Sequence, residues 1–114
     1  MESYTESCAV FVTAPTRLEA INLAEMLVAK RLAACVQVLP EMLSIYQWDG
    51  ATQRAAEHLI ICKTTRERFA ELEQTVRAAH SYTTPEIIAL PIVAGSAPYL
   101  AWLTETVSSN TNLR

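Results

Sequence analysis

The chain has 114 residues, 51% of them hydrophobic, and a formal net charge of −3. This length predicts a single domain over 1–114, whose core we expect at about 8–107 from the elements described below, and the apolar content excludes a disordered chain. The acidic balance argues against nucleic-acid binding, the apolar runs are too short to cross a bilayer, and the polar segment MESYTESC does not resemble a secretory signal. Three widely spaced cysteines, Cys8, Cys35 and Cys62, form no CxxC pair and favour free thiols in a reducing cytoplasm.

The N-terminal part predicts a strand followed by a helix. Residues 8–12 form a short apolar run that is typical of a strand. Thr16 and Glu19 then have the spacing of a capping box, in which each side chain bonds a free backbone N–H at a helix start. The apolar residues expected on the buried face of this helix recur at helical spacing: Leu18, Ile21, Ala24, Val28 and Leu32.

A long β-hairpin is predicted next. Residues 34–48 look extended, and Pro40 within them suggests a bulge or an edge strand. The Asp-Gly pair at 49–50 predicts the turn, and 57–64 is the expected returning strand. On the first strand, alternation assigns one face to Leu43, Ile45 and Gln47, and the other to Ser44, Tyr46 and Trp48.

A second helix and a further strand follow the hairpin. Thr64 and Glu67 repeat the capping-box spacing. The apolar residues expected on the buried face of this helix are Phe69, Leu72, Val76 and Ala79. Pro85 then marks a turn, and 86–92 reads as an apolar strand.

The chain closes with a short helix. Ser96 and Pro98 suit its start, and 108–114 is the expected frayed tail. Its expected buried positions are Leu100, Leu103 and Val107. The order β-α-β-β-α-β with an added helix predicts the α+β class and a ferredoxin-like sandwich.

Two strands are apolar on both faces. Every residue in 59–62 and in 87–90 is apolar, whereas a sheet covered by helices on one side alternates apolar with polar residues. Both faces of the sheet must therefore be buried against other parts of the structure. In so short a chain we expect the second cover to come from another copy, and we predict an obligate homo-oligomer.

The residues that could bind a ligand or a metal are concentrated at 80–86. His80 and Glu86 flank a turn and are natural metal ligands, with Tyr82 adding a hydrogen bond, but the alternative is that His80 simply ends a helix and Glu86 pairs locally. Glu57 becomes a site candidate if it shares a face with Leu59 and Ile61, because a buried carboxylate needs a partner.

Other candidates are weaker on sequence alone. His58 is expected to face a cleft or solvent, and Lys63 to hold an anion or to be a solvated charge. The cysteines are expected in the core, since no base pairs with them in the sequence. The aromatic residues expected to stack on a ligand, or to lie in an interface, are Tyr46, Trp48 and Trp102.

Six blocks resemble the CutA family, the divalent-cation tolerance proteins. They cover about 9–107 in order: VTAP at 12–15, RLAACV at 31–36, SIYQWDG at 44–50, KTTRERF at 63–69, HSYTTPEIIALPI at 80–92 and YLAWL at 99–103. The resemblance implies a ferredoxin-like subunit in a tight homotrimer, similar to the PII signalling proteins, with the long hairpin reaching into a neighbouring subunit and a site in the cleft between subunits.

The resemblance also implies a set of site residues. The polar cluster of the family falls on Glu57, His80, Tyr82 and Glu86, of which His80, Glu57 and Glu86 are the expected metal ligands. Tyr46 and Trp48 match the aromatic block of the family's long hairpin. Together with Lys63, which is a candidate from its own charge and not from the resemblance, Tyr82, Tyr46 and Trp48 are the expected ligand contacts in the cleft. Bacterial members described as copper binders carry a cysteine and a histidine where this chain has Val12 and Ala79. Ser81 replaces the proline that is usual in the family.

Three functions follow as hypotheses. The first is a cytoplasmic homotrimer that binds a divalent metal such as copper and supports metal tolerance. The second is a PII-like signalling or scaffold trimer that binds a small anion or a partner protein, with no metal role. The third, an enzyme, is not expected, because the sequence shows no nucleophile with a base.

Overall fold

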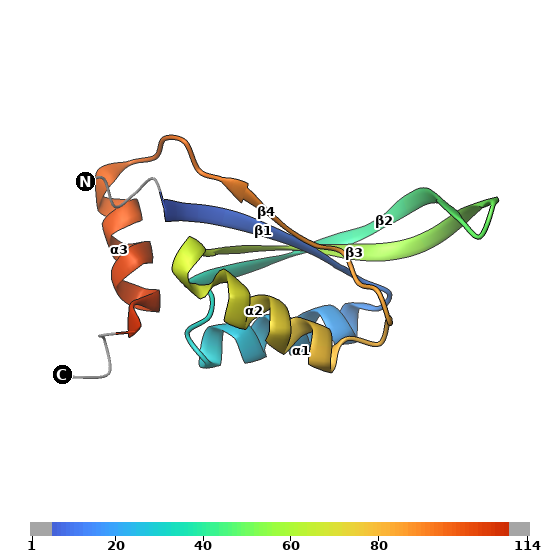
Figure 1. Ribbon diagram of the computed structural model, residues 1–114, viewed down its shortest axis with the longest axis horizontal. Helices are drawn as coiled ribbons and strands as arrows, with labels where there is room; N and C mark the ends of the chain where they lie inside the picture. Colours follow the sequence, from blue (N-terminus) through green and yellow to red (C-terminus); the bar gives the residue numbers. More distant parts are fainter. Residues whose placement is uncertain (1–5, 110–114) are drawn as a thin grey trace.

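The computed structural model describes residues 6–109, in which one four-stranded sheet carries two helices on one face and a third beyond its end (Figure 1). The elements follow the predicted order: β1 (Ser7–Ala14), α1 (Arg17–Ala29), β2 (Cys35–Trp48), β3 (Ala51–Thr65), α2 (Arg66–Ala79), β4 (Ile87–Pro91) and α3 (Ala97–Val107). The expected tail at 108–114 falls mostly outside the described residues.

The sheet has the strand order β2-β3-β1-β4, and all neighbouring strands are antiparallel. β1 and β2 therefore lie on either side of β3, which is the split βαβ arrangement. α1 and α2 lie side by side beneath the same face of the sheet (Figure 1). The predicted ferredoxin-like α+β sandwich with a C-terminal helix is confirmed.

The β2–β3 hairpin is longer than the sequence indicated and extends well beyond the rest of the sheet (Figure 1). Its two-residue turn has positive φ at Asp49 (53°) and Gly50 (78°), as the Asp-Gly pair predicts. The register shifts between Val38 and Glu41, so the bulge expected around Pro40 is confirmed, on an edge strand. The expected start of the returning strand at 57 is wrong, because residues 51–56, which lack large apolar side chains, also pair with β2.

The main core lies between the sheet and its two covering helices. Its buried members include Val10, Val12 and Ala14 of β1, and Ile60 and Cys62 of β3. The helices contribute Ala20, Leu23 and Leu27 from α1, and Leu72 and Val76 from α2.

The face predicted for α1 is wrong in part. Leu18 and Val28 are exposed, whereas Ala20, Leu23 and Leu27 are buried against the sheet. Apolar residues occur on several sides of this helix, so spacing alone does not select one face. Contact with the sheet selects the side on which two alanines, Ala20 and Ala24, allow close approach.

The second predicted capping box is also wrong. Thr65, not Thr64, is the N-cap of α2, and its side chain makes no capping hydrogen bond. The hydroxyl of Thr64 is buried and donates to the carbonyl oxygen of Leu32 at 2.7 Å. Leu72 and Val76 are buried as predicted, Phe69 packs partly against the core, and Ala79 is exposed.

α3 matches its prediction closely. Ser96 caps the helix by accepting from the backbone N–H of Tyr99, and Pro98 lies in the first turn. Leu103 and Val107 are buried in a second small cluster with Ala34, beside Ile92. No helix within residues 6–109 is long and apolar enough to cross a membrane.

The face of the sheet opposite α1 and α2 has an apolar centre, with Glu57 and Lys63 towards its two ends. Phe11 pairs with Ile61 on one side and Ile88 on the other, and these three residues share this face with Ala9 and Leu90. Ile88 and Leu90 are 49% and 41% exposed in the single subunit. This surface is the one for which the sequence predicts cover by another copy.

Candidate functional site

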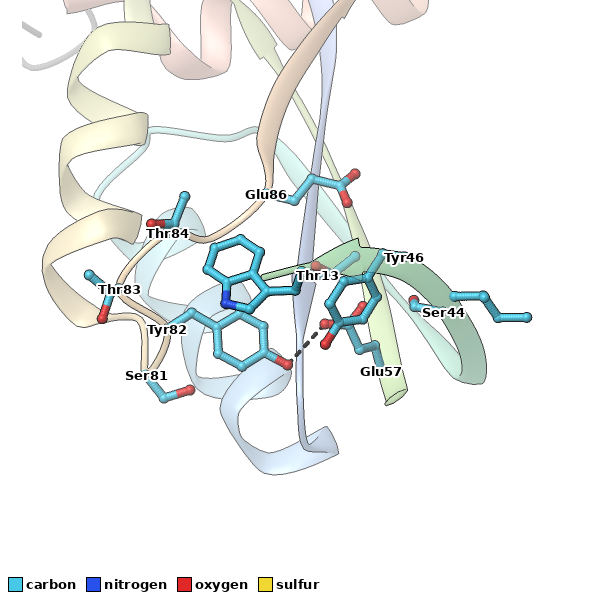
Figure 2. A pocket seen from close by; sticks show the side chains of 11 residues that line it. Thr13, Ser44, Tyr46, Glu57, Ser81, Tyr82, Thr83, Thr84 and Glu86 are labelled. Atoms are coloured by element: carbon cyan, nitrogen blue, oxygen red, sulfur yellow. Dashed lines mark hydrogen bonds between the residues drawn. The ribbon is translucent and has the colours of Figure 1, made fainter. Parts of the chain in front are cut away.

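A pocket of about 700 Å³ lies where the outer part of β2, close to the hairpin turn, and Glu57 in the middle of β3 meet the end of β1 and the loop 80–86 (Figure 2). Its side chains fall into three chemical groups. The aromatic rings are those of Tyr46, Trp48 and Tyr82. The carboxylates are Glu57 and Glu86. The hydroxyls belong to Thr13, Ser44, Ser81, Thr83 and Thr84, and Ile45 completes the lining.

Glu57 is a buried carboxylate on an apolar strand face. It is 7% exposed, and strand alternation puts it on the face of Leu59 and Ile61, as the sequence analysis allowed. Its partner is Tyr82, whose hydroxyl donates to Glu57 Oε2 at 2.9 Å. Burial, followed by this hydrogen bond, raises the pKa of Tyr82 to about 12. The phenol therefore stays protonated and remains a donor to the carboxylate.

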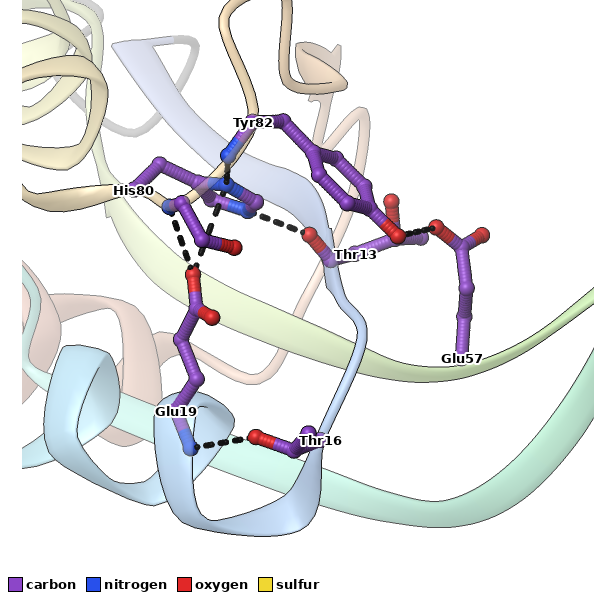
Figure 3. Close-up of polar contacts among 7 residues, drawn as sticks. Thr13, Thr16, Glu19, Glu57, His80 and Tyr82 are labelled. Carbon is purple, nitrogen blue, oxygen red and sulfur yellow. Dashed lines mark hydrogen bonds and ion pairs between the residues drawn. The ribbon is translucent and has the colours of Figure 1, made fainter.

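His80 is held by both nitrogens of its ring (Figure 3). Its Nε2 lies 2.7 Å from the carbonyl oxygen of Thr13, which only accepts, so Nε2 carries the proton. Its Nδ1 accepts from the backbone N–H of Tyr82 at 3.0 Å. The side chain is fully buried. His80 thus joins the loop to β1, and its ring satisfies two backbone groups in the neutral form.

Glu19 is a site residue that the sequence analysis did not assign. The first half of its capping box forms, because Thr16 Oγ1 accepts from the N–H of Glu19 at 3.1 Å. Its carboxylate turns instead to the loop, where Oε2 accepts from the N–H of Ser81 at 2.9 Å and lies 3.5 Å from His80 Nδ1 (Figure 3). Local spacing could not reveal this use, since the partner lies 62 residues further along the chain.

The three expected metal ligands do not form a cluster within one subunit. Over residues 6–109, no group of three or more His, Cys, Asp or Glu side chains is placed to hold a metal ion. Glu57 and Glu86 line the same pocket, but both nitrogens of His80 are already hydrogen-bonded. Val12, at the position of the cysteine in copper-binding members, is buried in the core.

Three other candidates lie away from the pocket. Lys63 does not line it, and its ammonium donates to Gln37 Oε1 at 2.7 Å on the sheet. Trp102 is on α3, with its ring 5.5 Å from that of Tyr99. His58 does not face a cleft or solvent as expected; it is buried, with Nδ1 3.1 Å from the carbonyl oxygen of Leu39.

The cysteines behave as core residues. Cys8 and Cys62 are buried, Cys35 is half-buried, and all three are free. Burial raises the pKa of the Cys8 thiol, and it raises that of Cys62 to about 12 with a smaller contribution from Cys35 and Cys8. Such thiols are poor nucleophiles, and the predicted packing role is confirmed for the two buried residues.

Residues 8–106 match the sequence model of the family described as CutA1 divalent ion tolerance protein. The chain belongs to this family. It is 46% identical over 96 residues to the divalent-cation tolerance protein CutA of Thermus thermophilus, a match that covers 84% of this chain and 93% of the relative. Identity to the CutA of Archaeoglobus fulgidus is 45% over 98 residues, covering 86% and 95%.

Solved CutA structures share the fold. The CutA1 structure from Oryza sativa superposes with a TM-score of 0.90 at 38% identity, covering 95% of this chain and 99% of that one. The Thermus thermophilus structure gives 0.87 at 44% identity, covering 88% and 97%. Relatives differ in the compartment that their names give: an Archaeoglobus fulgidus CutA structure is described as periplasmic, and a CutA of Arabidopsis thaliana as chloroplastic.

Proposed function

We propose that this CutA protein is a single-domain homotrimer that binds a divalent metal ion in a cleft between subunits. The observation that carries the proposal is the pair Glu57 and Glu86, two carboxylates that line one pocket. The pocket has no Lys or Arg among its described lining residues to neutralise them. Family membership supports the link to divalent cations.

The donor atoms favour a cation that prefers oxygen. Carboxylate and hydroxyl oxygens suit ions such as Mn²⁺ and Mg²⁺, whereas copper prefers imidazole and thiolate. No imidazole of the described residues lines the pocket, and the ring of His80, beside Tyr82, bonds Thr13 and Tyr82 through its two nitrogens. We therefore assign metal ligation to Glu57 and Glu86 and a supporting role to His80. Copper ligation by His80, Glu57 and Glu86 together, as the sequence suggested, requires the ring of His80 to give up at least one of these two hydrogen bonds.

Two carboxylates are too few for a tight site, so a second subunit or water must complete the coordination. The apolar sheet face with Ile88 and Leu90, and the hairpin with its exposed Leu43 and Ile45, offer a large surface for other copies. Burial of this surface would supply the hydrophobic driving force for assembly. The three free thiols support the cytoplasm as the compartment.

A PII-like signalling or scaffold trimer without a metal role is the second candidate. The aromatic and hydroxyl lining of the pocket favours some organic ligand. A small anion is disfavoured at this pocket, because two carboxylates line it and Lys63 lies elsewhere. Neither function requires a catalytic residue, and we assign none.

Titration calorimetry with Mn²⁺, Zn²⁺ and Cu²⁺ tests the metal proposal. We expect Glu86→Gln to weaken binding of the preferred ion by about tenfold or more, since it removes one charged ligand. Glu41→Gln is the matched control, because Glu41 is an exposed carboxylate on β2 that does not line the pocket. Equal affinities of the two variants, or no binding of any ion by the wild-type protein, would refute the carboxylate site.

A further inference from the structure

The pocket combines two features that an inorganic cation does not need together. Glu57 and Glu86 supply negative charge, and Tyr46, Trp48 and Tyr82 supply aromatic surface. Its volume of about 700 Å³ is much larger than one hydrated metal ion requires. The rings therefore need an explanation beyond metal ligation.

The hairpin register puts two of the rings on the side of the buried carboxylate. Met42 lies opposite Glu57, so strand alternation gives Tyr46 and Trp48 the same face as Glu57. The loop adds Tyr82, whose hydroxyl points to Glu57, and Tyr46 lines the same pocket (Figure 2). Rings from two separate segments thus converge on one carboxylate.

These hairpin rings remain half exposed in the subunit. Tyr46 is 43% exposed and Trp48 is 55% exposed. Neither residue has a ring contact within the described chain, whereas Trp102 stacks near Tyr99 and Tyr82 lies against His80. Their faces are therefore open within the single subunit, on the side that lines the pocket.

The electrostatic character of the pocket is fixed by Glu57 and its partner. The Tyr82 phenol, whose pKa is raised to about 12 by burial and by this hydrogen bond, stays protonated and donates to the buried Glu57 carboxylate. A buried carboxylate favours a cation as its counterpart. With Glu86 at the rim and no Lys or Arg among the described lining residues, the pocket selects against anions.

A small organic cation satisfies all of these groups at once. Quaternary ammonium and alkylated amine groups are attracted to aromatic faces and to carboxylates, and they hold water less tightly than a metal ion does. We propose that this pocket binds a small organic ammonium ion, held between the rings of Tyr46, Trp48 and Tyr82 and the carboxylates of Glu57 and Glu86. This inference goes beyond the proposed metal function and does not depend on it.

Calorimetric titration with choline tests the inference, with chelator present so that metal plays no part. The comparison ligand is the neutral carbon analogue, in which a tert-butyl group replaces the trimethylammonium group. We expect choline to bind at least about tenfold more tightly than the analogue, because only the cation gains from the ring faces and the carboxylates.

Two variants and a control locate the site. Trp48→Leu keeps an apolar side chain without a π face, and Glu86→Gln removes one charge; each should weaken choline binding by about tenfold. Trp102→Phe, which alters an aromatic residue outside the pocket, should leave it unchanged. Size-exclusion chromatography identifies any variant that has changed its assembly.

Equal binding of choline and its analogue would overturn the inference, as would no choline binding by the wild-type protein or full binding by Trp48→Leu. The metal proposal is decided separately, by Mn²⁺ titration of the wild-type protein without chelator. Choline binding without Mn²⁺ binding would leave the present inference standing alone, and the reverse result would remove it while keeping the metal site.

Discussion

The hydroxyl of Tyr82 donates a 2.9 Å hydrogen bond to Glu57 Oε2 and so joins the loop after α2 to the middle of β3. The two residues are 25 positions apart in the chain. Because Glu57 is 7% exposed, this bond replaces water at a buried carboxylate. The bond therefore connects the stability of the subunit to the shape of the pocket.

Replacing Tyr82 by Phe should destabilise the protein. The change removes the donor and leaves a buried carboxylate oxygen without it, which costs about 1–3 kcal/mol. Thermal unfolding followed by circular dichroism measures the loss as a lower midpoint. Tyr46→Phe is the matched control, since it removes a hydroxyl from an exposed ring in the same pocket. Equal midpoints for the two variants would contradict a stabilising role for the Tyr82–Glu57 bond.

Replacing Glu19 by Ala should loosen the turn at Ser81. The N–H of Ser81 loses its acceptor, and a hydrogen bond to a charged group contributes about 1.5–3 kcal/mol. Hydrogen exchange of the Ser81 amide should become about tenfold faster or more. Glu25→Ala is the control, because Glu25 is an exposed residue of the same helix. An unchanged exchange rate in Glu19→Ala would show that the carboxylate does not hold the turn.

Stability should fall in alkaline solution. The pKa values of Tyr82 and Cys62 are raised to about 12 in the folded chain, against unfolded values of about 10 and 9. A raised pKa means that the folded state retains its proton longer, so its contribution is complete below the unfolded pKa and is lost as the pH rises toward 12. Unfolding midpoints between about pH 8 and 12 should decline, and Tyr82→Phe and Cys62→Ala should each lessen the decline. If the unfolding midpoints of both variants declined as steeply as those of the wild-type protein, the decline would not come from Tyr82 and Cys62.

A charge on the helix-free sheet face should prevent assembly. Ile88→Lys puts an ammonium among apolar residues that we expect to be covered by another copy, where an unpaired charge is strongly unfavourable. Sedimentation analysis should show oligomer for the wild-type protein and monomer for the variant. Ala70→Lys, on the exposed side of α2, should sediment as the wild type does. A wild-type protein that stays monomeric at low micromolar concentration would disprove the homotrimer.

Local chemistry determined much of the fold from the sequence alone. The Asp-Gly pair specifies a two-residue turn because both positions need positive φ, and Ser96 with Pro98 specifies the start of α3. The apolar runs of β3 and β4 indicated that the second face of the sheet must also be buried, although they did not identify what covers it. These features depend on neighbouring residues and on the backbone preferences of each residue type, so they can be predicted from a single sequence.

The tertiary structure alone decided how the site residues are used. His80 has the chemistry of a metal ligand, but its place beside Thr13 and the N–H of Tyr82 occupies both ring nitrogens. Glu19 looked like half of a capping box, and the approach of the loop 80–86 gives its carboxylate a different partner. The same side chain satisfies whichever groups the fold brings within about 3 Å, since a hydrogen bond requires close contact. Sequence spacing does not determine which distant segments come that close, and so it identified the candidate residues but not their partners.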